Sequence, residues 1–258
     1  MQNKLNITIV QSNLVWENIE ANLQNFSKKL ENLQNSDLII LPEMFNTGFS
    51  MNSKNLAEKT DGKSLKWLIN LAKEKQSAVI ASLIIEENKQ FFNRLYFVLP
   101  NGNLQFYNKR HLFRMANEHN YYSPGKEELI VKYKGWRIKT LVCYDLRFPV
   151  WSRNKNNYDL LIYVANWPER RSEPWKILLK ARAIENQSYV VGVNRVGTDG
   201  NNVIFSGDSA VINPKGEIIS ETKAHEETVE TLEIDLDELN EFKEKFPAYI
   251  DADNFEIK

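Results

Sequence analysis

Two kinds of apolar spacing alternate along the chain. Residues 6–10 are rich in β-branched residues and predict a first strand. Apolar residues then recur at gaps of three and four: Trp16, Ile19, Leu23, Phe26, Leu30 and Leu33. This spacing places one apolar stripe along a helix. We therefore expect the helix to cover one side of a sheet.

Unbroken apolar runs mark strands that are buried on both faces. Residues 38–41 form such a run, and Pro42 ends it because proline cannot donate to a strand ladder. Further strands are predicted at 78–85, 91–99, 104–107, 129–133, 136–143, 158–164, 189–194, 204–212, 217–220 and 228–234. Further helices are predicted at 63–75, 150–153, 172–186 and 236–245, with Ser172 as a cap.

These elements occur in two similar runs, and no linker divides them. We therefore predict a single α/β domain over residues 1–258, ending in a tail from about residue 246 to residue 258. Two sheets would pack face to face, with helices on both outer sides. The predicted architecture is a four-layer α-β-β-α sandwich.

Composition and charge indicate what kind of protein this is and which partners it would not bind. Hydrophobic residues make up 42% and charged residues 26%, as in ordered globular proteins. The net charge of −1 leaves no positive excess, so neither nucleic acid nor a membrane surface is expected as a partner. A single cysteine excludes an intramolecular disulfide and fits a reducing compartment. With no recognisable leader and no apolar stretch of about 20 residues, we expect a cytoplasmic protein.

Three predicted strands end in residues that can carry out chemistry. Glu43 follows the run at 38–41, Lys109 follows a hairpin, and Cys143 ends a buried strand. Each also has a structural interpretation: a capping glutamate, a solvated lysine and a small buried thiol. If neighbouring strands carry all three, they meet at one rim of the sheet. A nucleophile, a carboxylate base and a cation form the set that acyl transfer needs.

The motifs around these residues resemble a known family. Residues 41–44 (LPEM), 107–113 (YNKRHLF) and 142–149 (VCYDLRFP) resemble, in this order, the three signatures of the nitrilase (carbon-nitrogen hydrolase) superfamily. Glu118, followed by YSPG at 122–125, matches the loop that carries a second glutamate in that family. The resemblance implies the four-layer sandwich and a homodimer.

Other segments narrow the resemblance to one branch. Residues 165–168 (ANWP), 181–187 (ARAIENQ) and 246–249 (FPAY) resemble bacterial ω-amidases. These enzymes hydrolyse the terminal amide of small dicarboxylic monoamides such as 2-oxoglutaramate and 2-oxosuccinamate. Many relatives carry an acidic residue where this chain has Arg114.

The resemblance implies a mechanism with a thioester intermediate. Cys143 would attack the amide carbonyl, and Glu43 would take the thiol proton. Lys109 and the backbone N–H of Tyr144 would stabilise the oxyanion, with Glu118 orienting Lys109 or the substrate. No metal or organic cofactor is required.

Substrate contacts are predicted near the end of the 158–164 strand. A guanidinium suits the substrate carboxylate, and we favour Arg171 over Arg170, although a solvated loop pair is an equal alternative. Arg147 is predicted to be structural and to bridge to a carboxylate. Trp167 and Phe113 are candidate apolar walls, with a role in the core as the alternative.

Three rival functions remain. An N-carbamoyl amidase or nitrilase would share Glu43, Lys109 and Cys143 and differ only in the pocket. A metal-dependent phosphodiesterase would need clustered ligands, whereas the three histidines are scattered along the chain. A non-catalytic binding scaffold would not need a buried lysine beside two acids. The expected partner is a small-molecule amide.

Overall fold

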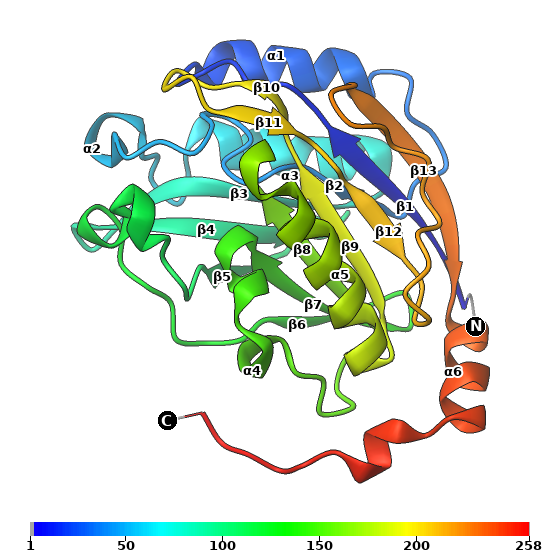
Figure 1. The fold of residues 1–258 in the computed structure, drawn as a ribbon. Helices are drawn as coiled ribbons and strands as arrows, with labels where there is room; N and C mark the ends of the chain where they lie inside the picture. The colour runs from blue at the N-terminus through cyan, green and yellow to red at the C-terminus, as the bar shows by residue number, and fades with distance from the viewer. Residues whose placement is uncertain (1–2, 258) are drawn as a thin grey trace.

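The computed structural model describes residues 3–257, which form two large sheets and a short hairpin (Figure 1). The first sheet has the strand order β13-β1-β2-β3-β4-β5. Its strands are β1 (Lys4–Gln11), β2 (Leu38–Ile40), β3 (Ala78–Glu87), β4 (Gln90–Val98), β5 (Leu104–Asn108) and β13 (Thr228–Asp235). The pairs β1–β2 and β2–β3 are parallel, and the other pairs are antiparallel.

The second sheet has the order β12-β9-β8-β7-β6. Its strands are β6 (Ile130–Tyr133), β7 (Trp136–Val142), β8 (Leu160–Ala165), β9 (Tyr189–Asn194) and β12 (Ala210–Ile212). The three central strands β7, β8 and β9 run parallel. A separate hairpin pairs β10 (Val196–Thr198) with β11 (Ile204–Ser206).

Alternating residues of the first sheet face different layers. Ile40 and Ile80 belong to the cluster that includes Ile138 and Ile162 of the second sheet. Their neighbours on the other face pack with helices α1 (Ile19–Leu30) and α3 (Lys63–Lys75). The period of two in the strands therefore separates the central core from the outer helical layer.

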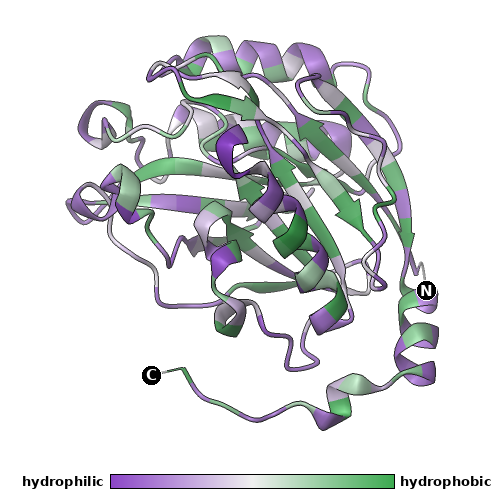
Figure 2. Ribbon diagram, in the orientation of Figure 1, coloured by the Kyte–Doolittle hydropathy of each residue, from purple (hydrophilic) through white to green (hydrophobic). Residues whose placement is uncertain are grey.

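Helix α5 (Ser172–Asn186) covers the outer face of the second sheet, beside the shorter α4 (Pro149–Ser152) (Figure 1). The remaining helices are α2 (Ser53–Leu56), α6 (Leu236–Lys245) and the 3₁₀ helices η1 (Arg114–Ala116), η2 (Glu118–Asn120), η3 (Cys143–Arg147), η4 (Glu169–Arg171) and η5 (Ala248–Asp251). Figure 2 shows apolar residues gathered on the central strands and polar residues along the outer helices and loops. The predicted four-layer α-β-β-α sandwich is confirmed.

Two of the predicted elements are wrong in detail. The strand predicted at 204–212 is two strands, β11 and β12, which belong to different sheets. Gly207 and Asp208 between them both have positive φ, at 80° and 55°, and this conformation breaks a strand. No strand forms at 217–220, where only an isolated bridge joins Ile218 to Ile212.

The tail after α6 runs beneath the body of the protein (Figure 1). Lys155 donates a hydrogen bond of 2.8 Å to the carbonyl of Phe255, and its ammonium lies 4.5 Å from the centre of that ring. The described part of the tail therefore contacts its own chain. No helix within residues 3–257 combines the length and the apolar character needed to cross a membrane.

Close packing of α5 on β9 depends on Gly192. A Cβ at this position would lie 2.5 Å from Leu179 Cδ1 and 2.8 Å from Trp175 Cζ2. We expect Gly192→Ala to lower the free energy of unfolding by about 1–3 kcal/mol, because the helix must shift outward. Urea denaturation measures this change. An unchanged midpoint and slope would contradict the packing described here.

Candidate active site

Three loops at one rim of the two sheets carry the predicted site residues. Glu43 lies three residues after β2, Lys109 directly follows β5, and Cys143 directly follows β7. All three side chains are buried. Lys109 Nζ lies 3.0 Å from Glu43 Oε1, so the segments that follow β2 and β5 of the first sheet converge here.

Glu118 completes this cluster from helix η2. Both of its carboxylate oxygens lie 3.0 Å from Lys109 Nζ, and Oε2 also accepts a hydrogen bond from the Phe113 N–H at 2.5 Å. The predicted convergence of Glu118 on Lys109 is therefore present. Together with Glu43, the cluster holds one ammonium between two carboxylates in a site that water does not reach.

Burial and charge act in opposite directions on the lysine. Burial alone lowers the pKa of Lys109, but Glu118 and then Glu43 raise it by more, so its pKa is above the ordinary value. Burial raises the pKa of Glu118, and Lys109 opposes that rise. Lys109 is thus a permanent cation at neutral pH.

Cys143 adopts an unusual backbone conformation. Its φ of 46° lies in the left-handed region, which costs a residue with a side chain roughly 1–3 kcal/mol. This turn ends β7, begins η3, and leaves Sγ 3.9 Å from the carbonyl oxygen of Asn166. Burial, and then the Glu43 carboxylate, raise the pKa of the Cys143 thiol. The resting thiol is therefore protonated and needs a base before it can act as a nucleophile.

Asp145 joins the loop of the nucleophile to the loop of the lysine. Its Oδ2 accepts hydrogen bonds from Val142 N at 3.0 Å and from Tyr107 Oη at 2.8 Å. Its Oδ1 accepts from His111 N at 3.0 Å and lies 2.7 Å from His111 Nδ1. The His111 ring stacks on Phe148 with the ring centres 3.7 Å apart. These contacts fix Cys143 and Lys109 in one rigid frame.

Two asparagines at the cluster are absent from the sequence-based prediction. The Asn166 N–H donates to Glu43 Oε2 at 2.8 Å, and Asn93 Nδ2 donates to Glu43 Oε1 at 2.7 Å. Asn166 had a visible signal, since it ends the buried strand β8 in the same way that Glu43 follows β2. Asn93 had a weaker signal: it is a polar residue within the largely apolar strand β4, at the start of the stretch that is buried.

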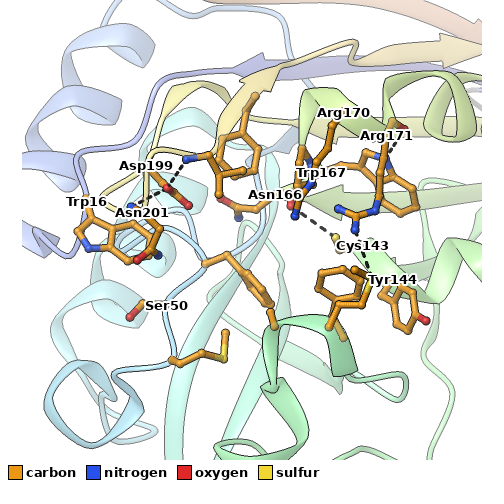
Figure 3. A pocket seen from close by; sticks show the side chains of 18 of the residues that line it. Trp16, Ser50, Cys143, Tyr144, Asn166, Trp167, Arg170, Arg171, Asp199 and Asn201 are labelled. Carbon is orange, nitrogen blue, oxygen red and sulfur yellow. Dashed lines mark hydrogen bonds between the residues drawn. The ribbon is translucent and has the colours of Figure 1, made fainter.

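A cavity of about 700 Å³ opens onto this cluster (Figure 3). Cys143 is only 8% exposed, and it is the one member of the Glu43–Lys109–Cys143 set that lines the cavity. All four predicted substrate contacts also line it: Phe113, Tyr144, Trp167 and Arg171. Arg114 is exposed and does not line the cavity.

The predicted role of Arg147 is wrong. Arg147 lines the cavity, with its guanidinium carbon 5.2 Å from the centre of a Trp167 ring. It forms no ion pair with any carboxylate of residues 3–257. The turn of η3 directs this side chain toward the cavity, which the spacing along the sequence did not indicate.

Three arginines, Arg147, Arg170 and Arg171, line the cavity that Cys143 also lines; Figure 3 labels two of them, Arg170 and Arg171. Neither Arg170 nor Arg171 pairs with a carboxylate in the described part of the chain. Burial lowers the pKa of Arg171, and repulsion from Arg170 and Arg147 lowers it further. Arg171 Nη1 is buried and has no hydrogen-bond partner among the described residues. This wall of the cavity is suited to an anion.

No group of three or more His, Cys, Asp or Glu residues is arranged to hold a metal ion within residues 3–257. The phosphodiesterase interpretation required such a group of ligands.

Comparisons with known proteins agree with this geometry. The sequence model described as "Carbon-nitrogen hydrolase" matches residues 6–244. The chain belongs to the carbon-nitrogen hydrolase family. The predicted membership of the nitrilase superfamily is therefore confirmed, and with it an enzyme that hydrolyses amides.

Several relatives match nearly the whole chain. The "Omega-amidase YafV" of Escherichia coli K12 is 49% identical over 98% of both chains. The "2-oxoglutaramate amidase" of Bacillus subtilis is 35% identical over 84% of this chain and 85% of its own. The crystal structure of a CN-hydrolase superfamily protein from Xanthomonas campestris, described with an arsenic adduct in the active site, is 43% identical. It superposes with a TM-score of 0.97 over 99% of both chains.

Asp145 provides a test of the rigid frame. We expect Asp145→Asn to lower the free energy of unfolding by about 1–3 kcal/mol, because an amide N–H would face donors that now bind a carboxylate oxygen. Catalysis of amide hydrolysis should fall with it. Tyr107→Phe removes one donor to Asp145 and also the acceptor of the Arg110 N–H and of Trp151 Nε1. It should therefore lower stability as well, but it keeps the Asp145 contacts to Val142 and His111 and should have a smaller effect on activity. Equal stability and activity of Asp145→Asn and the unmodified protein would contradict this role.

Proposed function

We propose that this protein is an ω-amidase. It hydrolyses the terminal amide of small dicarboxylic monoamides, of the 2-oxoglutaramate or 2-oxosuccinamate type, and releases ammonia. The observation that carries the proposal is one cavity lined both by Cys143 and by three arginines, none of which forms an ion pair with a carboxylate of residues 3–257. The names of the relatives from Escherichia coli and Bacillus subtilis support the same substrate class.

The first step is attack of Cys143 Sγ on the amide carbonyl. Glu43 takes the thiol proton, and a tetrahedral intermediate forms with its charge on the former carbonyl oxygen. The Lys109 ammonium and the Tyr144 N–H donate to that oxyanion. Tyr144 lies in the first turn of η3, where backbone N–H groups lack partners within the helix. Preorganised donors of this kind are worth roughly 100- to 1,000-fold each in rate.

Glu43 then returns the proton to the amide nitrogen. The C–N bond breaks, ammonia leaves, and the acyl group remains on Cys143 as a thioester. Water enters the vacated space, Glu43 takes one of its protons, and the resulting hydroxide attacks the thioester carbonyl. The second tetrahedral intermediate collapses to the free acid and the Cys143 thiolate, which takes back the proton held by Glu43 and so restores the thiol and the carboxylate. Throughout, Glu118 keeps Lys109 protonated and in position.

Arg171 and Arg147 bind the carboxylate at the other end of the substrate. Neither guanidinium has a competing carboxylate among the described residues, and Arg171 Nη1 lacks any partner there. A planar guanidinium matches a carboxylate through two parallel hydrogen bonds. Phe113 and Trp167 form apolar walls beside these groups, where the guanidiniums already lie over both rings.

The single cysteine makes the nucleophile easy to test. Cys143→Ala should abolish ammonia release from 2-oxoglutaramate and 2-oxosuccinamate, because no other residue can form the thioester. EDTA should have no effect on the unmodified protein. A coupled ammonia assay measures both results. Activity that persists in Cys143→Ala would contradict the thioester mechanism, and turnover of carbamoyl compounds or nitriles alone would contradict the substrate class.

The arginines should determine affinity for the carboxylate. We expect Arg171→Met and Arg147→Met to reduce kcat/KM for 2-oxoglutaramate by about 10- to 100-fold, the usual effect of losing a charge-assisted hydrogen bond. Turnover of a neutral amide of the same length should change little. Arg114→Met serves as the matched control, because Arg114 is exposed and does not line the cavity. Equal losses of kcat/KM on the charged and the neutral substrate would show that these arginines have a structural role and do not bind the carboxylate.

We further propose that the protein is a homodimer of the cytoplasm, where its single thiol stays reduced. Ile177 and Ile184 lie seven residues apart on the outer face of α5 and are 61% and 56% exposed. Val150 of the adjacent α4 is 55% exposed. Neighbouring exposed apolar side chains of this kind mark an interaction surface.

Charge placed on this face should separate the subunits. The double variant Ile177→Glu/Ile184→Glu should sediment as a monomer, whereas the unmodified chain should sediment as a dimer. Ile204→Glu is the control, since Ile204 is 51% exposed but lies on β11. Dimers of the same strength in all three proteins would contradict the assignment of the α5 face.

A further inference from the structure

Asn93 occupies a position where an apolar residue would be expected. It lies in β4, pairs with Ile84 of β3 and is buried. Its backbone carbonyl oxygen accepts a hydrogen bond of 2.9 Å from the backbone N–H of Lys109. Its side chain points at the carboxylates, with Nδ2 2.7 Å from Glu43 Oε1 and 3.4 Å from Glu118 Oε1. One residue therefore contacts all three charged members of the cluster.

The Asn93 amide is satisfied on one side only. Its Oδ1 is buried and has no hydrogen-bond partner within residues 3–257. A buried acceptor without a partner is unfavourable and is rare in folded proteins. The useful part of the Asn93 side chain is therefore its amide N–H groups, because these are the atoms that face Glu43.

The two oxygens of Glu43 have different surroundings. Oε1 receives two donors, Lys109 Nζ at 3.0 Å and Asn93 Nδ2 at 2.7 Å. Oε2 receives one donor, the Asn166 N–H at 2.8 Å. A carboxylate oxygen accepts about two hydrogen bonds, so Oε1 is saturated and Oε2 retains one free lone pair. Only Oε2 can take a proton without losing an existing contact.

We propose that Asn93 is a positioning residue that holds Oε1 of Glu43 and so directs the proton of Cys143 to Oε2. The thiol proton leaves Sγ, the S–H electron pair stays on sulfur, and the new O–H bond forms at Oε2. This inference rests on the proposed role of Glu43 as the base. It does not depend on which amide is the substrate.

The other groups that face Glu43 favour this division of roles. Lys109 is a fixed cation, and Glu118 is held by Lys109 and by the Phe113 N–H. Burial, and then Glu118, raise the pKa of Tyr122, so this phenol stays neutral. Among these groups Asn93 is the neutral donor that contacts both glutamates. An aspartate there would add a third carboxylate to one ammonium.

Alkylation of the thiol by iodoacetamide tests the proposal without any substrate. Cys143 is the only cysteine, so the rate reports on this site alone, and Cys143→Ser sets the background. In the unmodified protein the alkylation rate should increase as the pH is raised from the acidic side, and we call this increase the acidic rise. In Asn93→Asp and Asn93→Ala the acidic rise should occur at higher pH, by about one unit or more, because a hydrogen-bond donor to the base has been removed.

A buried asparagine outside the cluster provides the control for folding. Asn154 is buried, and its Nδ2 donates only to the carbonyls of Tyr158 and Asn186. Asn154→Asp should lose stability and keep the acidic rise in place. If Asn93→Asp fails to fold, Asn93→Ala gives the same comparison with no added charge.

The result that overturns the proposal is an acidic rise that stays in place in both Asn93 variants, or one that moves equally in Asn154→Asp. A wrong substrate assignment would leave the alkylation profiles unchanged and appear only in the ammonia assay. The proposal also requires that Glu43→Gln lose the acidic rise. If the acidic rise persists in Glu43→Gln, Glu43 is not the base.

Discussion

The active site depends on one buried ammonium between two carboxylates. Lys109 Nζ lies 3.0 Å from both Glu43 and Glu118, and all three side chains are inaccessible to water. Removing one partner from such a buried group is strongly destabilising, at about 3–5 kcal/mol, because the remaining charge has no solvent to stabilise it. The cluster therefore requires the sandwich around it, and it constrains the segments that follow β2 and β5 to converge, although β3 and β4 lie between these two strands.

The rest of the site follows from that constraint. Asp145 connects the lysine loop to the turn of the nucleophile, and this turn holds Cys143 at a positive φ. The thiol then lies at the floor of the cavity while its base remains below the surface. The cavity is lined both by the Cys143 thiol and by the guanidiniums of Arg147, Arg170 and Arg171. A monoamide that carries one carboxylate can place its amide at the thiol and its carboxylate at the guanidiniums.

Much of this arrangement was predictable from local patterns. The positions of Glu43, Lys109 and Cys143 are visible in the sequence, because each residue comes just after a predicted strand and residues that follow a strand lie at an edge of the sheet. The contacts of Asn93 and Arg147 were not predictable in this way. Asn93 meets Glu43 across 50 residues of chain, and Arg147 reaches the cavity only because η3 turns directly after β7. Similarly, the break between β11 and β12 results from two left-handed residues whose conformation no periodicity reports.

In the proposed reaction Cys143 carries the acyl group during turnover. Rapid acid quenching of the unmodified protein with excess 2-oxoglutaramate, followed by mass spectrometry of its peptides, detects this thioester. We expect a mass increase equal to the acyl group on the peptide that contains Cys143, and its loss on treatment with hydroxylamine. Steady ammonia release with that peptide unmodified at every time point, or an acyl group on another peptide, would rule out Cys143 as the acyl carrier.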